Sequence, residues 1–229
     1  MNRILIVGLS LLLISCNYKR NDIELTIHNF PKIIHDKTTD SLSIFPIRSL
    51  NDGKHHPLFI GEYCHEIKIK ENIILTNGFQ KYIDDYWKSI KRLKWSDSTI
   101  MPIIIDTTQI LEVNNRKSFP ILIQNNTKDS VLIGYGDRIP LITEALNQNG
   151  EWQAIEERYV YMCGTGLNSI ILPPNELLIS SIFIYSGDLP TKLRVKMGNN
   201  YSQEFLGNIH KTQFLNEWDN YVNDRNFRN

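Results

Sequence analysis

The second half of the chain is a succession of short apolar segments separated by turn residues. From residue 100 onward they recur at intervals of roughly 8–15 residues, the spacing typical of all-β sandwiches. Two joins carry specific turn signals. Asn149-Gly150 is favoured in tight hairpins, and Pro173-Pro174 stands where pairing must end before a long strand. The pattern predicts a mainly β fold, with a β-sandwich over residues 100–215. The expected strands lie in IMPIIID, SFPILIQN, SVLIGYG, IPLITEALN, EWQAIEE, SIILPP, ELLISSIFIY and TKLRVKM.

Residues 23–99 predict shorter strands followed by one helix. FIGEYCHEIKIK alternates, so Tyr63, His65, Ile67 and Ile69 share one face of an expected strand and Cys64 lies on the polar face. Over residues 78–94, apolar side chains follow spacings of three and four, which predicts one amphipathic helix packed on a sheet. A similar spacing near the carboxyl end predicts a short helix or tail over residues 216–229.

The first sixteen residues contain a short apolar run with a single basic residue before it. Residues 4–14 are too few to cross a bilayer core of ~30 Å, which takes about 20 apolar residues, and they suit a signal peptide. Leu13-Ile14-Ser15-Cys16 resembles the lipobox of bacterial lipoproteins. The resemblance implies that residues 1–16 form the signal segment, that Cys16 is lipidated, and that residues 17–22 are a tether.

That resemblance also implies a place in the cell. Two or more acyl chains hold a protein stably on a membrane, so the mature chain is expected in the cell envelope. Asn17 follows the cysteine where inner-membrane retention of some lipoproteins uses Asp. The expected location is therefore the outer membrane.

A second resemblance concerns architecture. The stretch from FPILIQNNTKDSVLIG to LPPNELLISSIFIYSGDLPTKLRVKM is similar to immunoglobulin-like and fibronectin-like sandwiches, with paired asparagines after an early strand and a Pro-Pro corner before a long one. The core Cys…Trp…Cys arrangement of antibody domains is absent. The resemblance therefore implies an immunoglobulin-like β-sandwich and no activity.

Composition narrows the classes of partner. The chain has 25 basic and 25 acidic residues, and without a basic patch nucleic-acid binding has no electrostatic basis. The sequence shows no phosphate-binding loop, dinucleotide fingerprint, calcium loop or Ser-His-Asp signature, so we expect no cofactor.

Cys64 and Cys163 are the two cysteines beyond the signal segment. The envelope outside the inner membrane is oxidising, which allows one disulfide between them. It would close a loop of about 100 residues and stabilise the fold by ~4.7 kcal/mol in the chain-entropy view. The sequence leaves two alternatives for Cys64: a disulfide at the surface or a reduced thiol.

Three sets of residues carry chemistry-bearing side chains. HHPLFIGEYCHE holds His55, His56, Cys64, His65 and Glu66, but alternation and spacing do not match a zinc site, so no metal is predicted. Cys163 lies in the Gly-rich YMCGTGLNS, where a thiolate nucleophile would need a histidine base. Spacing selects no catalytic pair among the carboxylates Asp106, Asp137, Glu144, Glu151, Glu156 and Glu157.

Two hypotheses follow. The first is a lipid-anchored envelope protein that acts as a non-catalytic binding or assembly module, with no catalytic residues, presenting its edges and loops to envelope proteins or glycans. The alternative is an envelope hydrolase or thiol enzyme that uses Cys163, with His28, His35, His65 or His210 as base.

Overall fold

The computed structural model describes residues 26, 29–35, 55–69, 79–85, 88–89, 92–113, 116–156 and 168–214. Segments 1–16, 17–22 and 216–229, and with them Cys16, lie outside the described residues, as does Cys163. Within the described ranges the chain is mainly β, and no helix reaches seven residues. None of these short helical segments has the length and apolar character needed to cross a membrane.

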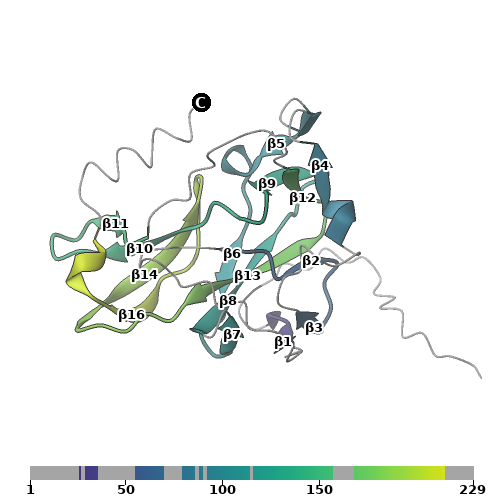
Figure 1. Cartoon of the computed structure of the whole chain (residues 1–229). Helices are drawn as coiled ribbons and strands as arrows, with labels where there is room; N and C mark the ends of the chain where they lie inside the picture. Colours follow the sequence, from purple (N-terminus) through teal and green to yellow (C-terminus); the bar gives the residue numbers. More distant parts are fainter. Residues whose placement is uncertain are drawn as a thin grey trace, which may run out of the picture.

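A central antiparallel sheet runs through the molecule (Figure 1). Its strands are ordered β2 (Phe59–Gly61), β13 (Leu177–Phe183), β8 (Arg116–Gln124) and β6 (Ile103–Ile105), and β7 (Leu111–Val113) also pairs with β8. The longest ladder joins β13 to β8 over seven paired positions, from Leu177 opposite Gln124 to Phe183 opposite Ser118.

Two further sheets and a strand pair lie against this one. The β10–β14 sheet has the order β11 (Trp152–Ala154), β10 (Ile142–Leu146), β14 (Leu189–Met197) and β15 (Asn200–Tyr201), with β16 (Phe205–Ile209) also on β14. The β9–β12 sheet has the order β4 (Ile83–Asp85), β12 (Asn168–Leu172), β9 (Val131–Tyr135) and β5 (Lys94–Trp95). The pair is β1 (Lys32–His35) with β3 (Glu66–Ile69), in parallel. Short 3₁₀ helices are η3 (Phe79–Tyr82), η4 (Ser96–Ser98) and η5 (Lys211–Gln213).

The central sheet is buried on both faces. Ile121 and Ile123 of β8 point into a core shared with the other two sheets, whereas Leu122 points into a second core under the β1–β3 pair. Strands covered on both faces lose their polar alternation, which is why β8 and β13 read as nearly continuous apolar runs. Strands on both sides of residue 100 share sheets, since β2 pairs with β13 and β4 with β12.

The stacked, mainly β architecture agrees with the predicted sandwich, and several local predictions are confirmed. The Asn149-Gly150 hairpin joins β10 to β11, and Gly150 has φ 80°, the left-handed region that favours glycine. The single strand expected in FIGEYCHEIKIK is corrected: β2 and β3 belong to different sheets, and residues 62–65 between them are not strand. Ile67 and Ile69 are buried as the alternation predicts, whereas Cys64, expected on the polar face, packs against the second core.

The prediction of one helix over residues 78–94 is not confirmed: residues 88–89 and 92 are α-helical, but the first part of the segment is not. Residues 79–82 form η3, and Ile83–Asp85 is strand β4, whose Ile83 lies opposite Ile170 of β12. The β-branched side chain of Ile83 suits a half-buried strand as well as a helix face. Pairing with β12 satisfies the backbone hydrogen bonds of β4, and the local spacing of apolar residues cannot reveal that pairing.

The two motifs behind the immunoglobulin-like resemblance meet at one corner. Asn125 follows β8 and is fully buried. Its Nδ2 donates to the carbonyls of Leu172 and Pro173 at 2.9 and 3.0 Å, and its Oδ1 accepts from the Thr127 amide at 3.0 Å. One asparagine therefore ties the turn after β8 to the Pro-Pro corner before β13.

Candidate functional site

Of Cys64 and Cys163, between which the sequence allows a disulfide, the structure describes Cys64 alone. Cys64 is half-buried and packs against the second core, beside the β1–β3 pair. Because Cys163 lies outside the described residues, the disulfide and the thiol-enzyme hypothesis both stay predictions.

The histidines of the HHPLFIGEYCHE window diverge. His55 is buried against Glu156, and the half-buried His56 contacts Asp137. The exposed His65, just before β3, has its ring edge-on to Tyr63. Among the residues that the structure describes, no group of three or more histidine, cysteine, aspartate or glutamate side chains converges as metal ligands do.

His55 is the centre of a buried polar network. Its Nε2 lies 3.0 Å from Oε2 of Glu156, its Nδ1 lies 2.9 Å from the Ser181 carbonyl, and both side chains are 3% exposed. Glu156 also accepts from the Thr143 amide and from the Tyr185 hydroxyl. Burial lowers the pKa of His55, but the Glu156 carboxylate and the hydrogen bonds outweigh it and raise the pKa above its ordinary value.

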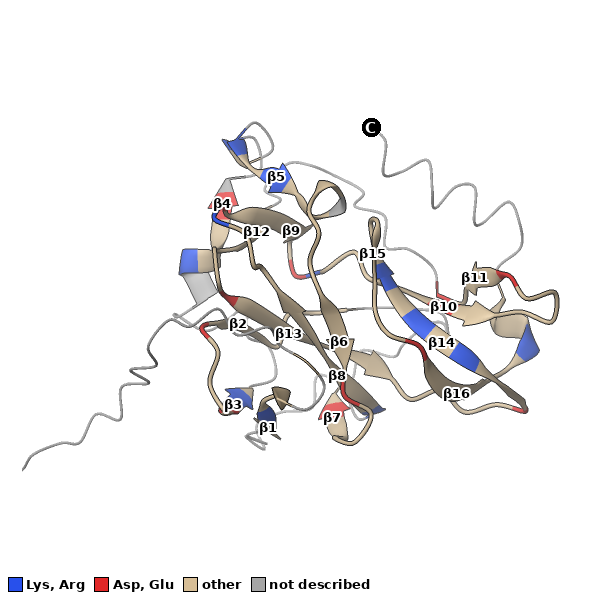
Figure 2. Ribbon diagram, turned by 180° about the vertical axis from the view of Figure 1, so that it is seen from behind, with Lys and Arg blue, Asp and Glu red and all other residues tan. Residues whose placement is uncertain are grey.

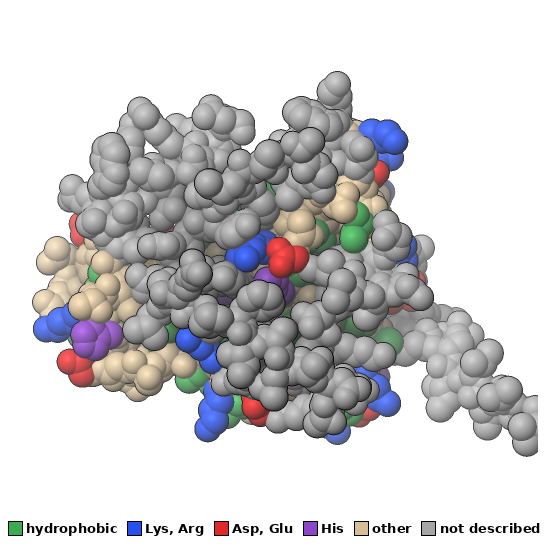
Figure 3. Space-filling view, viewed as in Figure 1, with side chains coloured by type: hydrophobic (Ala, Val, Ile, Leu, Met, Phe, Trp, Pro, Cys, Tyr) green, Lys and Arg blue, Asp and Glu red, His purple; other side chains and the backbone are tan. Residues whose placement is uncertain are grey.

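The pKa of the neighbouring His56 is shifted in the opposite direction. Its Nδ1 lies 2.8 Å from the Asp137 carbonyl and 3.4 Å from Oδ2 of the same residue, and Asp137 also pairs with Arg138. Burial is the largest influence, and it lowers the pKa of His56 despite the nearby carboxylate. Figure 3 shows basic, acidic and histidine side chains side by side near the middle of one face.

The other candidate carboxylates serve separate local roles. Asp106 accepts hydrogen bonds from the Thr108 amide and hydroxyl and from Nε2 of Gln109. Burial opposes its charge, but these hydrogen bonds lower the pKa of Asp106 below its ordinary value. Glu144 pairs with Arg194 at 2.6 Å, Glu151 accepts from Asn147, and Glu157 lies outside the described residues.

A different surface gathers more functional groups, namely the outer face of the β10–β14 sheet. Alternation along β14 turns Leu193, Val195 and Met197 inward and leaves three cations on the other side. Figure 2 shows these basic positions in a row along β14. The row consists of Lys192, Arg194 and Lys196.

Arg194 is held between two aromatic rings on this face. Its guanidinium carbon lies 4.3 Å from the ring centroid of Trp152 and 4.3 Å from that of Tyr201. Glu144, opposite Arg194 in the β10–β14 register, holds the guanidinium by two contacts of 2.6 Å to its Oε2. The three flat groups come from β11, β14 and β15, so a rigid sheet orients them.

The same face carries exposed apolar surface and a shallow depression. Tyr201 is 45% exposed and Leu206, on β16, is 80% exposed. A hollow of about 500 Å³ lies beside Leu206. Its lining residues are Leu146, Pro190, Thr191, Lys192, Leu206, Gly207 and Asn208. Neither His55 nor Glu156 takes part in it.

The sequence reasoning did not identify this face. The alternating cations of TKLRVKM were a visible signal of a solvent-facing strand side. Trp152 and Tyr201 carried no such signal, because their approach to Arg194 depends on the pairing of β14 with both β10 and β15.

Comparisons with protein-family models, with curated proteins and with solved structures found no match to this chain.

Proposed function

We propose that this chain is a lipid-anchored protein of the cell envelope that acts as a non-catalytic binding module. The lipobox resemblance at Cys16 supports the anchor, and the rigid β scaffold supports a binding role. In this proposal the scaffold is an immunoglobulin-like sandwich, and the outer face of the β10–β14 sheet docks another envelope protein.

One observation carries the docking surface, the stack of Trp152, Arg194 and Tyr201. Tryptophan, tyrosine and arginine are the residue types most enriched at the energetic centres of protein interfaces. Here the guanidinium lies 4.3 Å from each ring centroid before any partner arrives. Less side-chain freedom is then lost on binding, which favours affinity.

The charges and the hollow indicate the kind of partner. Three cations on β14 stand against two carboxylates, Glu144 and Glu204, so this face carries one net positive charge (three minus two). The exposed Leu206 and the hollow offer an apolar centre beside that polar set, the usual anatomy of an interface. The partner we expect is a protein that presents an apolar side chain next to acidic residues.

Site-specific crosslinking in cells tests the docking surface. We expect a photo-crosslinking residue at Leu206 to give one adduct of defined mass with an envelope protein. The same residue at Ile110, which is 62% exposed just before β7, is the matched control and gives none. Arg194→Ala and Tyr201→Ala weaken the Leu206 adduct. Equal adduct patterns from Leu206 and Ile110, or a Leu206 adduct unchanged by both substitutions, would falsify the docking surface.

Fractionation tests the anchor separately. A Cys16→Ala chain should lose palmitate labelling and leave the membrane fraction, and the unaltered chain should fractionate with the outer membrane. A Cys64→Ala chain is the matched control and keeps its label. An unlabelled, uncut wild-type chain would contradict the anchor without bearing on the docking face.

A further inference from the structure

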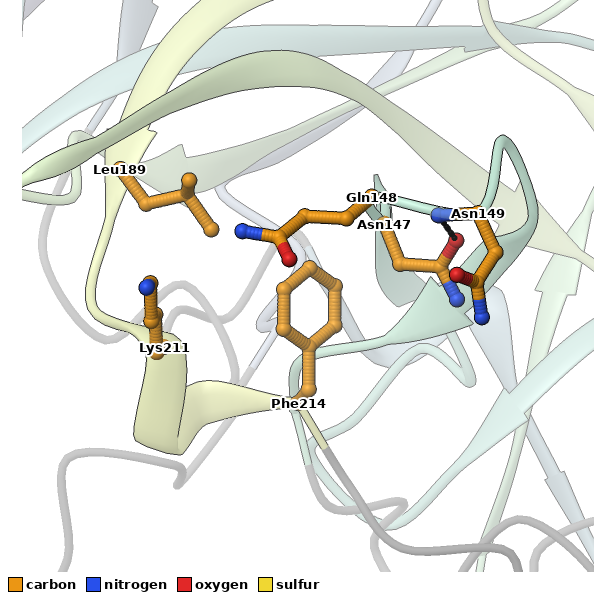
Figure 4. Close-up of a pocket in the computed structure, with 6 residues that line it drawn as sticks. All are labelled: Asn147, Gln148, Asn149, Leu189, Lys211 and Phe214. Atoms are coloured by element: carbon orange, nitrogen blue, oxygen red, sulfur yellow. Dashed lines mark hydrogen bonds between the residues drawn. The ribbon is translucent and has the colours of Figure 1, made fainter.

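We infer that the β10–β14 sheet carries a second binding site, at its end, shaped for a single acidic sugar unit. The site is a hollow of about 250 Å³ between the β10–β11 hairpin and η5 (Figure 4). Its lining residues are Asn147, Gln148, Asn149, Leu189, Lys211 and Phe214. This inference goes beyond the protein-docking face and involves none of the residues proposed there.

The hollow lies on the inner side of the sheet end. Leu189 and Phe214 pack against the small core formed by Ala145, Ile155, Leu193 and Ile209. Pro190, the next residue along β14, lines the outer-face hollow instead. Alternation along one strand therefore separates the two sites.

Asn147 makes the hairpin wall rigid. Its Oδ1 accepts from the amides of Asn149 and Glu151, both at 2.9 Å, and its Nδ2 donates to Gln153 at 3.1 Å. Figure 4 shows the first of these bonds and shows the Gln148 side chain reaching toward the space between Leu189 and Phe214. The Asn147 side chain therefore holds the hairpin, and the side-chain amides of Gln148 and Asn149 are not needed for that role.

Three polar groups around the hollow remain uncommitted. Gln148, Asn149 and Lys211 are exposed. Within the described part of the chain, no hydrogen bond or ion pair engages these three side chains. Polar groups that line a hollow without protein partners are available to orient a ligand.

The chemistry of these groups matches a hydroxylated ring with a negative charge. Each amide both donates and accepts, as does each sugar hydroxyl. The face of the Phe214 ring carries the negative part of an aromatic quadrupole, which suits the polarised C–H groups on one face of a sugar ring. The Lys211 ammonium supplies a charge-assisted hydrogen bond to a carboxylate.

The volume limits the ligand to one ring. Sites for drug-sized molecules occupy ~300–1,000 Å³, and this hollow of about 250 Å³ is smaller. The ligand class is therefore a hexuronic acid, free or as one unit of a glycan.

Titration of the full chain in detergent tests the site, with ¹⁵N-labelled asparagine and glutamine side chains observed by NMR. We expect D-glucuronate to shift the amide signals of Gln148 and Asn149 with a dissociation constant in the millimolar range. D-glucose, which has the same ring without the carboxylate, should bind about tenfold more weakly, the effect of one hydrogen bond to a charged group.

Substitutions assign the contacts. Lys211→Gln should reduce glucuronate affinity to that of glucose, whereas Lys128→Gln, an exposed lysine in the turn before β9, leaves it unchanged. Phe214→Ala should abolish binding of both sugars. Because Phe214 also packs on a core, Lys211→Gln decides the outcome if that variant does not fold.

Three results would overturn the inference. They are an absence of shifts with glucuronate, an affinity unaffected by Lys211→Gln, and equal shifts from acetate, which carries the charge but no ring. The Leu206 adduct is independent of all three, so this site and the docking face can fail separately.

Discussion

His55 and Glu156 are 101 positions apart in the sequence, and their side chains lie 3.0 Å apart with 3% of each exposed. The Glu156 carboxylate raises the pKa of His55 above 6.5 against the effect of burial. Protonated His55 therefore stabilises the fold below pH 6.5, and this contribution is lost as the pH rises through the pKa of the folded state.

Glu156→Gln is expected to lower the free energy of unfolding by about 3–5 kcal/mol below pH 6.5, because it leaves a buried charge without its partner. The difference from wild type should shrink as the pH rises. Urea unfolding over a pH series measures both quantities. A difference that is independent of pH would show that the pair is not ionised.

His56 provides a control for that pH series, because its effect on stability changes with pH in the opposite direction. Its pKa is lowered below 6.5, so the fold favours the neutral ring and loses stability as the pH falls below 6.5. His56→Asn should remove this loss, so the variant gains stability relative to wild type toward low pH. A change in the same direction as Glu156→Gln would contradict the assignment.

Asn125→Ala is expected to destabilise the fold by about 3 kcal/mol, because buried carbonyl groups lose their donor. Those carbonyls belong to Leu172 and Pro173. Asn125→Asp has nearly the same volume but sets an oxygen against them, so it should cost at least as much. The exposed Asn126→Ala is the matched control, with an expected change within about 0.5 kcal/mol. Chemical denaturation gives all three values.

Arg194→Ala is expected to cost about 1–2 kcal/mol, since two cation–π contacts are lost from a half-buried site. Arg194→Lys keeps the charge without the planar guanidinium and should restore only part of it. Tryptophan emission should shift in both variants because Trp152 loses its stacked neighbour. Lys192→Ala, also on β14, should leave the emission unchanged, and a shift there would count against the stack.

Gly150 and Gly187 should respond differently to alanine. Gly150 has φ 80° with open space around an added Cβ, so Gly150→Ala should cost only the backbone strain of about 1 kcal/mol. At Gly187 the added Cβ would lie 2.1 Å from the carbonyl carbon of Ile209, so β16 must move, at a cost of roughly 3 kcal/mol. Thermal unfolding of the two variants makes the comparison, and equal losses would contradict it.

The strands after residue 100 could be predicted because their signals are local. Alternation along β14 and the hairpin glycine at Gly150 each act over a few residues. Strand β4 could not, since its one apolar residue, Ile83, also fits the helical spacing of residues 78–94 and the deciding partner is β12. The convergence of Trp152, Arg194 and Tyr201 was equally hidden, because it depends on register between strands that spacing does not reveal.

The burial of the central sheet on both faces has a consequence for any fragment of this protein. Leu122 and Ile179 are covered by the β1–β3 pair, which comes from the first seventy residues. A fragment that begins at residue 100 would leave an apolar sheet bare to water and should aggregate. The amino-terminal strands thus keep the carboxyl-terminal part soluble, and any recombinant form of that part needs them.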